Sequence, residues 1–243
     1  MTDAHCHVAR GASRHFLCDP CDASQAGAGD VRFAGTHPWL LDGFDADALR
    51  ARLAADPRLG VGEIGLDRLR ARTIPQRMRE VFEAQLGIAA EFRRPVALHG
   101  AKCWGEVVKA VEDAKRRHGG CPALLFHGFS RSDGLLPDIV ALGGYVSVGP
   151  AILNDHAVNY RELAQKIPED RLLAESDATA ETAASAPPVE DVAAKLAELR
   201  GLPPDAMAAR LEANADAFAG CLAVRAGELW YNTRMSLKQG EAT

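Results

Sequence analysis

Histidines near the start of the chain have the spacing of metal ligands. The sequence begins MTDAHCH, and because side chains alternate between the two faces of a β-strand, Asp3, His5 and His7 share one face. Two imidazoles about 7 Å apart along a strand can converge on one cation. These residues form only half of a metal site, and an exposed N-terminal run with incidental histidines explains them equally well.

The other candidate ligands come at or just after later apolar runs. Glu63 lies in LGVGEI, His99 ends PVALH, His127 ends PALLFH and Asp177 follows RLLAES. Buried charges and imidazoles are costly unless they are paired or bound to metal, so core packing is a poor explanation for the whole set. If the runs are parallel strands of one barrel, these side chains meet at its carboxyl-terminal end, where barrel enzymes have their active sites.

The elements that must position these residues alternate between short apolar runs and amphipathic helices, the rhythm of a parallel α/β protein. The first predicted strand ends near His7, and the others are residues 14–18, 31–36, 59–64, 95–99, 122–127, 145–148 and 171–175. The predicted helices are residues 45–55, 75–92, 104–117, 134–142, 158–167, 187–200 and 204–218. Eight strands, most of them followed by a helix, predict a (β/α)8 TIM barrel.

The early part of this barrel is irregular. Residues 19–29 are polar and small and too few for a full crossover helix, so we expect a shortened early crossover. A doubly wound open sheet is the competing architecture, but the chain has neither the glycine-rich dinucleotide fingerprint nor a Walker-type phosphate loop. We expect one hydrolase domain over residues 1–231 and a loose polar tail over residues 232–243.

Length and composition are those of a soluble globular protein. The chain has 243 residues, of which 47% are hydrophobic, and shows neither a membrane-length apolar run nor a signal-peptide pattern. We therefore expect a cytoplasmic protein without a membrane partner. The net charge of -5 argues against binding nucleic acid by bulk electrostatics, so metal ions would supply much of the attraction for phosphate.

The six cysteines, at positions 6, 18, 21, 103, 121 and 221, are spread as expected for reduced thiols. Cys18 and Cys21 form a single C-x-x-C pair. A structural zinc would need two more ligands, and only His15 and Cys6 are near in the sequence. We expect a loop with free thiols instead.

Several stretches together resemble the TatD family of metal-dependent hydrolases, within the amidohydrolase-like barrels. They are DAHCH, GTHPW, GEIGLD, IPQRMREVFEAQLGIAAEFRRPVALH, LFHGFS, GGYVSVG, LLAESDA and EANADAF, and they reach from residue 1 to about residue 218. The resemblance implies two divalent cations bridged by Glu63. The first ion would have three further ligands, His5, His7 and Asp177, and the second would have two, His99 and His127.

Such a binuclear centre suits phosphodiester hydrolysis. Two ions about 3.5–4 Å apart hold the attacking and leaving oxygens, and a metal-bound water is acidic enough to provide hydroxide at neutral pH. Asp177 would also act as the general base. Mixed imidazole and carboxylate ligation suits Zn, Mn or Ni and tolerates Mg, so the metal is left open.

The sequence departs from the family pattern near the expected substrate. Many members follow the equivalent of His99 with Cys-Arg, and that arginine can bind phosphate through two hydrogen bonds. Here a GAK stretch follows, and its Lys102 offers only a point charge. We expect Lys102 and His37 to contact the substrate, although His37 fits a structural turn beside Pro38 equally well.

The sequence thus predicts a metal-dependent hydrolase, most specifically a TatD-type deoxyribonuclease with exonuclease-like cleavage of DNA. The missing arginine keeps a second reading open, in which the same centre hydrolyses a small phosphoester, an amide or a lactone. A non-catalytic metal-binding protein is the third reading. Nothing in the sequence indicates an obligate protein partner.

Overall fold

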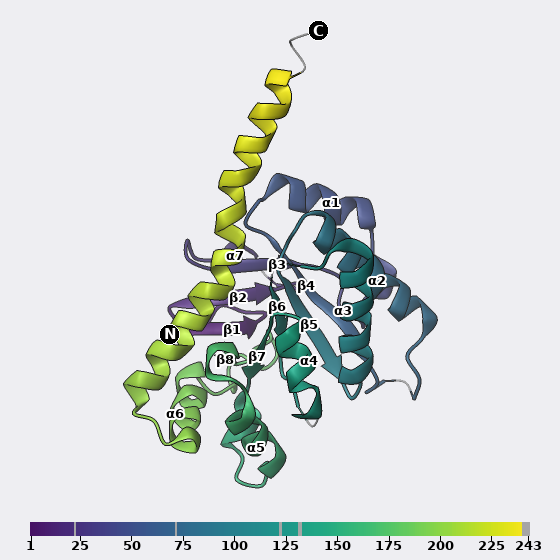
Figure 1. Cartoon of the computed structure of the whole chain (residues 1–243). Coiled ribbons are helices and arrows are strands. Elements are labelled where there is room, and N and C mark those ends of the chain that lie inside the picture. The colour runs from purple at the N-terminus through teal and green to yellow at the C-terminus, as the bar shows by residue number, and fades with distance from the viewer. Residues whose placement is uncertain (22, 71, 122, 131–132, 240–243) are drawn as a thin grey trace.

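Eight parallel strands lie side by side in the order of the sequence (Figure 1). The computed structural model describes the chain except for residues 22, 71, 122, 131–132 and 240–243. The strands are β1 (Thr2–Cys6), β2 (Arg14–Cys18), β3 (Val31–Ala34), β4 (Gly60–Asp67), β5 (Val96–Ala101), β6 (Leu124–Phe126), β7 (Gly144–Val148) and β8 (Leu172–Ala174). They form a nearly closed barrel, so the predicted α/β class is confirmed.

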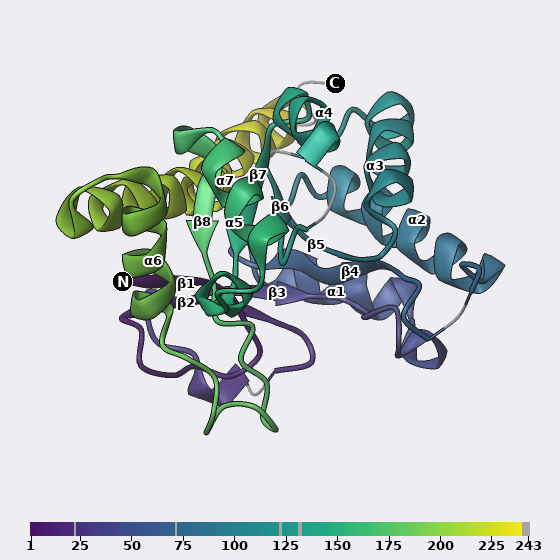
Figure 2. The same cartoon turned by 90° about the horizontal axis from the view of Figure 1, so that it is seen from below.

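Helices connect the strands from β3 to β8, two more follow β8, and all lie outside the strands (Figure 2). They are α1 (Ala46–Ala55), α2 (Gln76–Glu91), α3 (Trp104–His118), α4 (Leu136–Ala141), α5 (Val158–Lys166), α6 (Val189–Arg200) and α7 (Pro204–Gln239). Where the sequence predicted a shortened early crossover, the described residues between β1 and β3 contain only the short 3-10 helix η1 (Ala23–Gln25). None of the helices described is both long and apolar enough to cross a bilayer.

The seam between β1 and β8 is closed by the residues that follow β8. The Asp177 amide donates to the His5 carbonyl at 3.0 Å, and the His7 amide donates to the Ala178 carbonyl at 2.8 Å. Asp3 accepts from the Ser176 amide at 2.9 Å and from the Ser176 hydroxyl at 2.5 Å. In Figure 2 the purple connection after β1 and the green connection after β8 accordingly lie side by side.

Helix α2 fixes the loop that follows β3. The buried face of this helix is mostly apolar, but it includes the polar Gln85. The Gln85 side chain accepts from the Thr36 amide at 2.7 Å and donates to the Thr36 carbonyl at 3.1 Å. Because both hydrogen bonds hold the backbone just before His37, the position of His37 is set by a helix far from it in the sequence.

Helix α7 is longer than the sequence indicated. Its early part packs on the barrel, where Phe218 lies 5.4 Å from Phe16 and 5.5 Å from Tyr145 between ring centroids. The helix was predicted to end at residue 218, but its backbone continues to Gln239 and projects away from the barrel (Figure 1). Residues 219–239 contain no proline, so nothing in their covalent structure stops a helix, and residues 232–239 of the expected loose tail are helical. The domain boundary at residue 231 stays a prediction.

Replacing Gly65 by alanine is expected to destabilise the protein by about 1–3 kcal/mol, because the added methyl group overpacks the contact between β4 and β5. A Cβ atom at Gly65 would lie 2.0 Å from the His99 carbonyl oxygen, which is backbone and cannot move aside alone. Urea unfolding measures the change. Gly43→Ala is the matched control, since a Cβ atom there has no neighbour within 4 Å. Equal stability of both variants would contradict the argument.

Candidate metal centre

Glu63 lies at the middle of the site, on β4, and its side chain is buried. One carboxylate oxygen, Oε1, lies 2.6 Å from His99 Nδ1 and 2.7 Å from His127 Nε2. The other, Oε2, lies 3.1 Å from His7 Nε2 and 3.5 Å from His5 Nε2. Each oxygen therefore faces its own pair of imidazoles, in the same division that the resemblance implied for two metal ions.

The structure also brings Asp177 to this group. Its Oδ1 lies 3.7 Å from His5 Nε2, and its backbone is in the left-handed region with φ of 51°. For a residue other than glycine such a conformation costs about 1–3 kcal/mol, and the seam hydrogen bonds on either side of Asp177 maintain it. Asp3, which shares the strand parity of His5 and His7, is not part of the group, because its carboxylate is occupied by Ser176.

Cys18 orients the two histidines near the end of β1. Its backbone carbonyl accepts from His7 Nδ1 at 2.9 Å, so His7 Nε2 faces Glu63 with a free lone pair. Its thiol lies 3.5 Å from His5 Nδ1 and holds that ring with Nε2 toward Glu63. The Cys18 side chain is buried against the histidines, and no cysteine belongs to a cluster with metal-ligand spacing among the described residues.

Two carboxylates orient the other pair of histidines. Asp67 Oδ2 accepts from His99 Nε2 at 2.9 Å, which leaves His99 Nδ1 for Glu63. Glu175 Oε1 lies 3.8 Å from His127 Nδ1, and Glu175 also accepts a hydrogen bond from the Ser147 hydroxyl. Carboxylates behind imidazoles are typical of protein metal sites, where they fix the ring and raise its basicity.

The donor set fits divalent metal ions. His5 Nε2 is fully buried and has no hydrogen-bond partner among the described residues, an arrangement that is costly unless a cation takes the lone pair. Ligand atoms lie within 4.8 Å of one another in three groups: His5, His7 and Asp177; His5, Glu63 and His127; and His37, Glu63 and His99. Imidazole and carboxylate donors at such spacing are able to hold metal.

His37 faces the same centre in a different role. Its Nδ1 accepts the Trp39 amide hydrogen at 3.1 Å, so the ring proton is on Nε2, which lies 3.7 Å from Glu63 Oε1. Burial lowers the pKa of His37 to about 4, so the ring is neutral at physiological pH. His37 therefore presents an N–H donor rather than a metal-binding lone pair, as a contact to a substrate oxygen requires.

Electrostatics keep Glu63 ionised. Burial raises the pKa of Glu63, but the charges and hydrogen bonds of His127 and His5 outweigh burial, and the pKa lies well below its usual value. Burial lowers the pKa of His127, yet Glu63 and Glu175 overcome it and raise this pKa well above the ordinary value. The carboxylate is thus negatively charged throughout the physiological range and available as a ligand.

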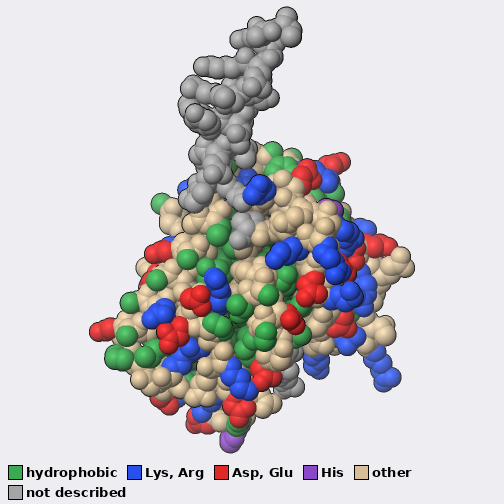
Figure 3. Space-filling view, viewed as in Figure 1, with side chains coloured by type: hydrophobic (Ala, Val, Ile, Leu, Met, Phe, Trp, Pro, Cys, Tyr) green, Lys and Arg blue, Asp and Glu red, His purple; other side chains and the backbone are tan. Residues whose placement is uncertain are grey.

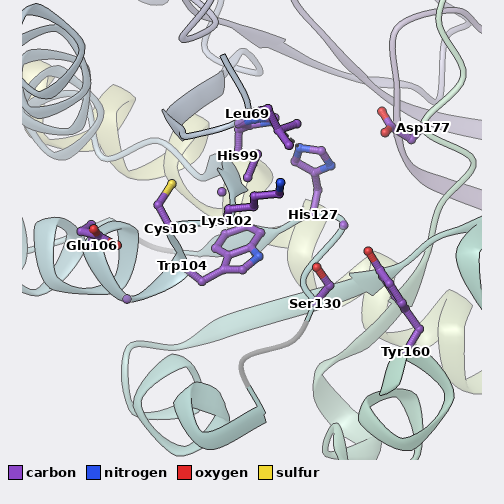
Figure 4. Close-up of a pocket in the computed structure, with 14 residues that line it drawn as sticks. Leu69, His99, Lys102, Cys103, Trp104, Glu106, His127, Ser130, Tyr160 and Asp177 are labelled. Carbon is purple, nitrogen blue, oxygen red and sulfur yellow. Dashed lines mark hydrogen bonds between the residues drawn. The ribbon is translucent and has the colours of Figure 1, made fainter. Parts of the chain in front are cut away.

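A pocket of about 700 Å³ opens beside the centre, and its lining includes His99, His127 and Asp177 (Figure 4). Figure 4 shows the Lys102 ammonium group and the hydroxyls of Ser130 and Tyr160 directed into this space. Sequence reasoning missed two of these: Ser130 stood in the quoted HGFS motif without being singled out, and Tyr160 lies in a helix without any motif. The contact of Cys18 with His7 was missed too, because it is made by a backbone carbonyl, which every residue type has.

A model of the TatD related DNase family matches residues 22–220. The chain belongs to this family. Its TatD relatives include a protein named 3'-5' ssDNA/RNA exonuclease TatD from Dickeya dadantii (strain 3937), 32% identical over 149 residues, or 60% of this chain and 55% of the relative. A protein of the same name from Citrobacter rodentium (strain ICC168) is 28% identical over 204 residues, which cover 77% and 76%. The first relatives are thus matched over little more than half their length.

Solved TatD structures have the same fold. YJJV, a TATD homolog from Escherichia coli K12, superposes with a TM-score of 0.71 at 23% identity, covering 89% of this chain and 96% of the homolog. A hydrolase TatD family protein from Entamoeba histolytica gives a TM-score of 0.67 at 14% identity, over 86% and 85% of the two chains. The predicted TIM barrel is confirmed.

Replacing Asp67 by asparagine is expected to weaken metal binding about 10- to 100-fold, the usual effect of losing a partner behind a metal ligand. The asparagine oxygen can still accept from the Leu69 amide, which Asp67 Oδ1 does at 2.6 Å, but its NH2 group cannot accept from His99. Competition with a fluorescent chelator measures the affinity. The exposed Asp205→Asn is the control, and equal affinities would remove Asp67 from the metal site.

Proposed function

We propose that this chain is a binuclear metal-dependent phosphodiesterase that degrades single-stranded DNA from an end, as a TatD-type deoxyribonuclease. The observation that carries the proposal is the carboxylate of Glu63, with two imidazoles on each oxygen. A bridging carboxylate of this kind is what a two-ion phosphodiester site needs. The names of the TatD relatives, which mention both single-stranded DNA and RNA, support the same proposal.

In this proposal two divalent ions, Zn, Mn, Mg or Ni, would be held by residues already described. His5, His7 and Asp177 would hold one ion, His99 and His127 would hold the other, and Glu63 would be shared between them. Bound ions would increase the acidity of the attacking water and neutralise charge on the phosphate. Asp67, Glu175 and Cys18 keep the imidazoles in position.

The remaining chemistry belongs to side chains of the chain itself. Asp177, half exposed at the mouth of the pocket, accepts the proton of the attacking water. The neutral His37 donates its Nε2–H to a phosphate oxygen, where negative charge increases during the reaction. Lys102 provides a positive charge from the pocket wall.

Electrostatic attraction is concentrated at this pocket. Figure 3 shows lysine and arginine mixed with aspartate and glutamate over one face of the molecule, consistent with the net charge of -5. Lys102 is the one lysine or arginine among the described residues that line the pocket. The substrate is therefore recognised chiefly by its reacting phosphate and the metal ions, rather than along an extended backbone.

The test is cleavage of a short single-stranded DNA with a free 3′ end. Metal-stripped protein is assayed first, and Mn²⁺ or Mg²⁺ is then restored, with Asp177→Asn run alongside to exclude a contaminating nuclease. Metal-dependent release of nucleotides that the variant lacks is the expected result. Two metal ions per chain without cleavage of any oligonucleotide would overturn the nuclease assignment.

The small-substrate reading is favoured by one observation: Lys102 is the one lysine or arginine among the described residues that line the pocket. An enzyme for a small phosphoester, amide or lactone needs no further charge for a flanking phosphate. Comparing an oligonucleotide with bis(p-nitrophenyl) phosphate separates the two functions, because a nuclease has the higher kcat/KM on the oligonucleotide. The cytoplasmic location and the lack of an obligate protein partner stay predictions.

Changing Lys102 to asparagine is expected to lower kcat/KM for DNA about 10-fold, mainly through KM, the magnitude of one lost charge-assisted hydrogen bond. Asparagine suits this position because Lys102 has a left-handed φ of 57°. The slope of log KM against log salt concentration should decrease by about 1, the value for one lost phosphate contact. Lys109→Asn, on the exposed side of α3, is the control. An unchanged salt dependence would show that Lys102 does not contact phosphate.

A further inference from the structure

Three of the four most exposed large apolar side chains among the described residues lie near the candidate metal centre. Among the described residues those with the largest exposure are Trp39 at 43%, Leu40 at 51%, Leu69 at 55% and Val158 at 55%. Trp39 and Leu40 follow His37 after a single proline, and Leu69 lines the same pocket as His99 and Asp177. Apolar surface that gathers at one site rather than scattering is typical of a binding surface.

Trp39 is held in place by the residues of the metal centre. Its ring centroid lies 4.9 Å from that of His37 and 6.4 Å from that of His99, edge to face in both cases. The Trp39 side chain also lies beside Asp67, the carboxylate that orients His99. The indole is therefore exposed yet fixed, one ring away from the histidines around Glu63.

Arg70 adds a second planar group. Its guanidinium carbon lies 3.7 Å from the centroid of the Trp39 ring, while the Arg70 side chain itself is exposed. Arginine and tryptophan planes are the two side-chain surfaces on which unstacked nucleobases pack. A base is separated from its phosphate by a single sugar, so a base whose phosphate lies at Glu63 reaches this pair.

We propose that Trp39 and Arg70 form a stacking platform for the nucleobase next to the scissile phosphate. The proposal rests on the proposed nuclease function and adds to it the group that the enzyme recognises besides phosphate. Stacking tolerates any base, because every base has an aromatic face, but it requires the base to leave a duplex. The platform thus selects unpaired ends with little preference for sequence.

The test compares two single-stranded oligonucleotides that differ only in whether the 3′-terminal nucleotide carries a base or is abasic. For the normal substrate, Trp39→Leu is expected to raise KM about 10-fold or more, the effect of losing one base–aromatic stack. For the abasic substrate, KM should be the same in wild type and Trp39→Leu. Trp39→Phe, which keeps an aromatic face, should restore most of the loss. Val158→Ala, at an exposed apolar side chain that is not among the residues lining the pocket, controls for lost apolar surface.

Two outcomes overturn the platform. An equal loss on both substrates would make Trp39 a positioning residue for His37 or Asp67, and no loss on either would remove it from binding. Binding separates these results from a failure of the nuclease assignment. In the Mg²⁺-loaded Asp177→Asn protein, deoxynucleoside monophosphate should quench tryptophan fluorescence, deoxyribose 5-phosphate should not, and Trp39→Phe should abolish the quenching. Quenching that survives in Trp39→Phe would also overturn the platform, even in a protein that cleaves no DNA.

Discussion

Replacing Asp177 by asparagine is expected to lower kcat for DNA cleavage about 10²- to 10⁴-fold, the range that a positioned general base provides. Asparagine has the same shape, tolerates the left-handed φ of 51°, and keeps the backbone hydrogen bond to the His5 carbonyl. What disappears is the negative oxygen 3.7 Å from His5 Nε2, which is the proton acceptor in the proposed mechanism. The measurement is kcat under saturating substrate and metal.

The fold should be unaffected, so the thermal midpoint of the metal-free Asp177→Asn protein should match that of wild type. Asp138→Asn, an exposed change in α4, is the control for altered net charge. Full kcat in Asp177→Asn would assign the general base to another group. A loss of kcat together with a loss of bound metal would show instead that Asp177 acts mainly as a ligand.

Replacing Glu63 by glutamine is expected to lower kcat/KM by more than about 1,000-fold, since even the outer partners of metal ligands are worth about 10- to 100-fold. Both oxygens of Glu63 face imidazole nitrogens, and glutamine would turn an NH2 group toward one of the two pairs. That pair loses its shared anionic ligand, so metal content should fall from two ions per chain to one or none.

Plasma mass spectrometry of the desalted protein measures this metal content. Glu106→Gln is the matched control, because Glu106 lines the pocket but pairs with Arg68 rather than with the histidines. Added metal should also raise the thermal midpoint of wild type and of Glu106→Gln. The increase for Glu63→Gln should be much smaller. Two bound ions and unchanged activity in Glu63→Gln would contradict a bridging role.

The histidines around Glu63 could be predicted because their positions follow from strand ends. A histidine at the end of an apolar run can be assigned to the site without knowing its partners, since parallel strands bring all such ends to one edge. The same reasoning placed His37 at the site, whereas Lys102 was expected there from the resemblance to the TatD family. Strand order was equally accessible, because each strand of this barrel pairs with the next one in the sequence.

Contacts that depend on register or on distant loops could not be predicted. Cys18 binds His7 through a carbonyl, which every residue has, so only the pairing of β1 with β2 reveals the contact. Asp3 was grouped with the histidines by parity, but its partner Ser176 lies 173 residues away. Tyr160 reaches the pocket from α5, whose helical pattern carries no sign of a site.

The seam between β1 and β8 has a consequence for synthesis of the chain. His5 and His7 are synthesised long before Asp177, and the hydrogen bonds that hold Asp177 to β1 come from the far end of the barrel. The candidate metal centre therefore cannot assemble on a growing chain until β8 has emerged. A nascent chain that carries only the first seven strands has an incomplete set of ligands.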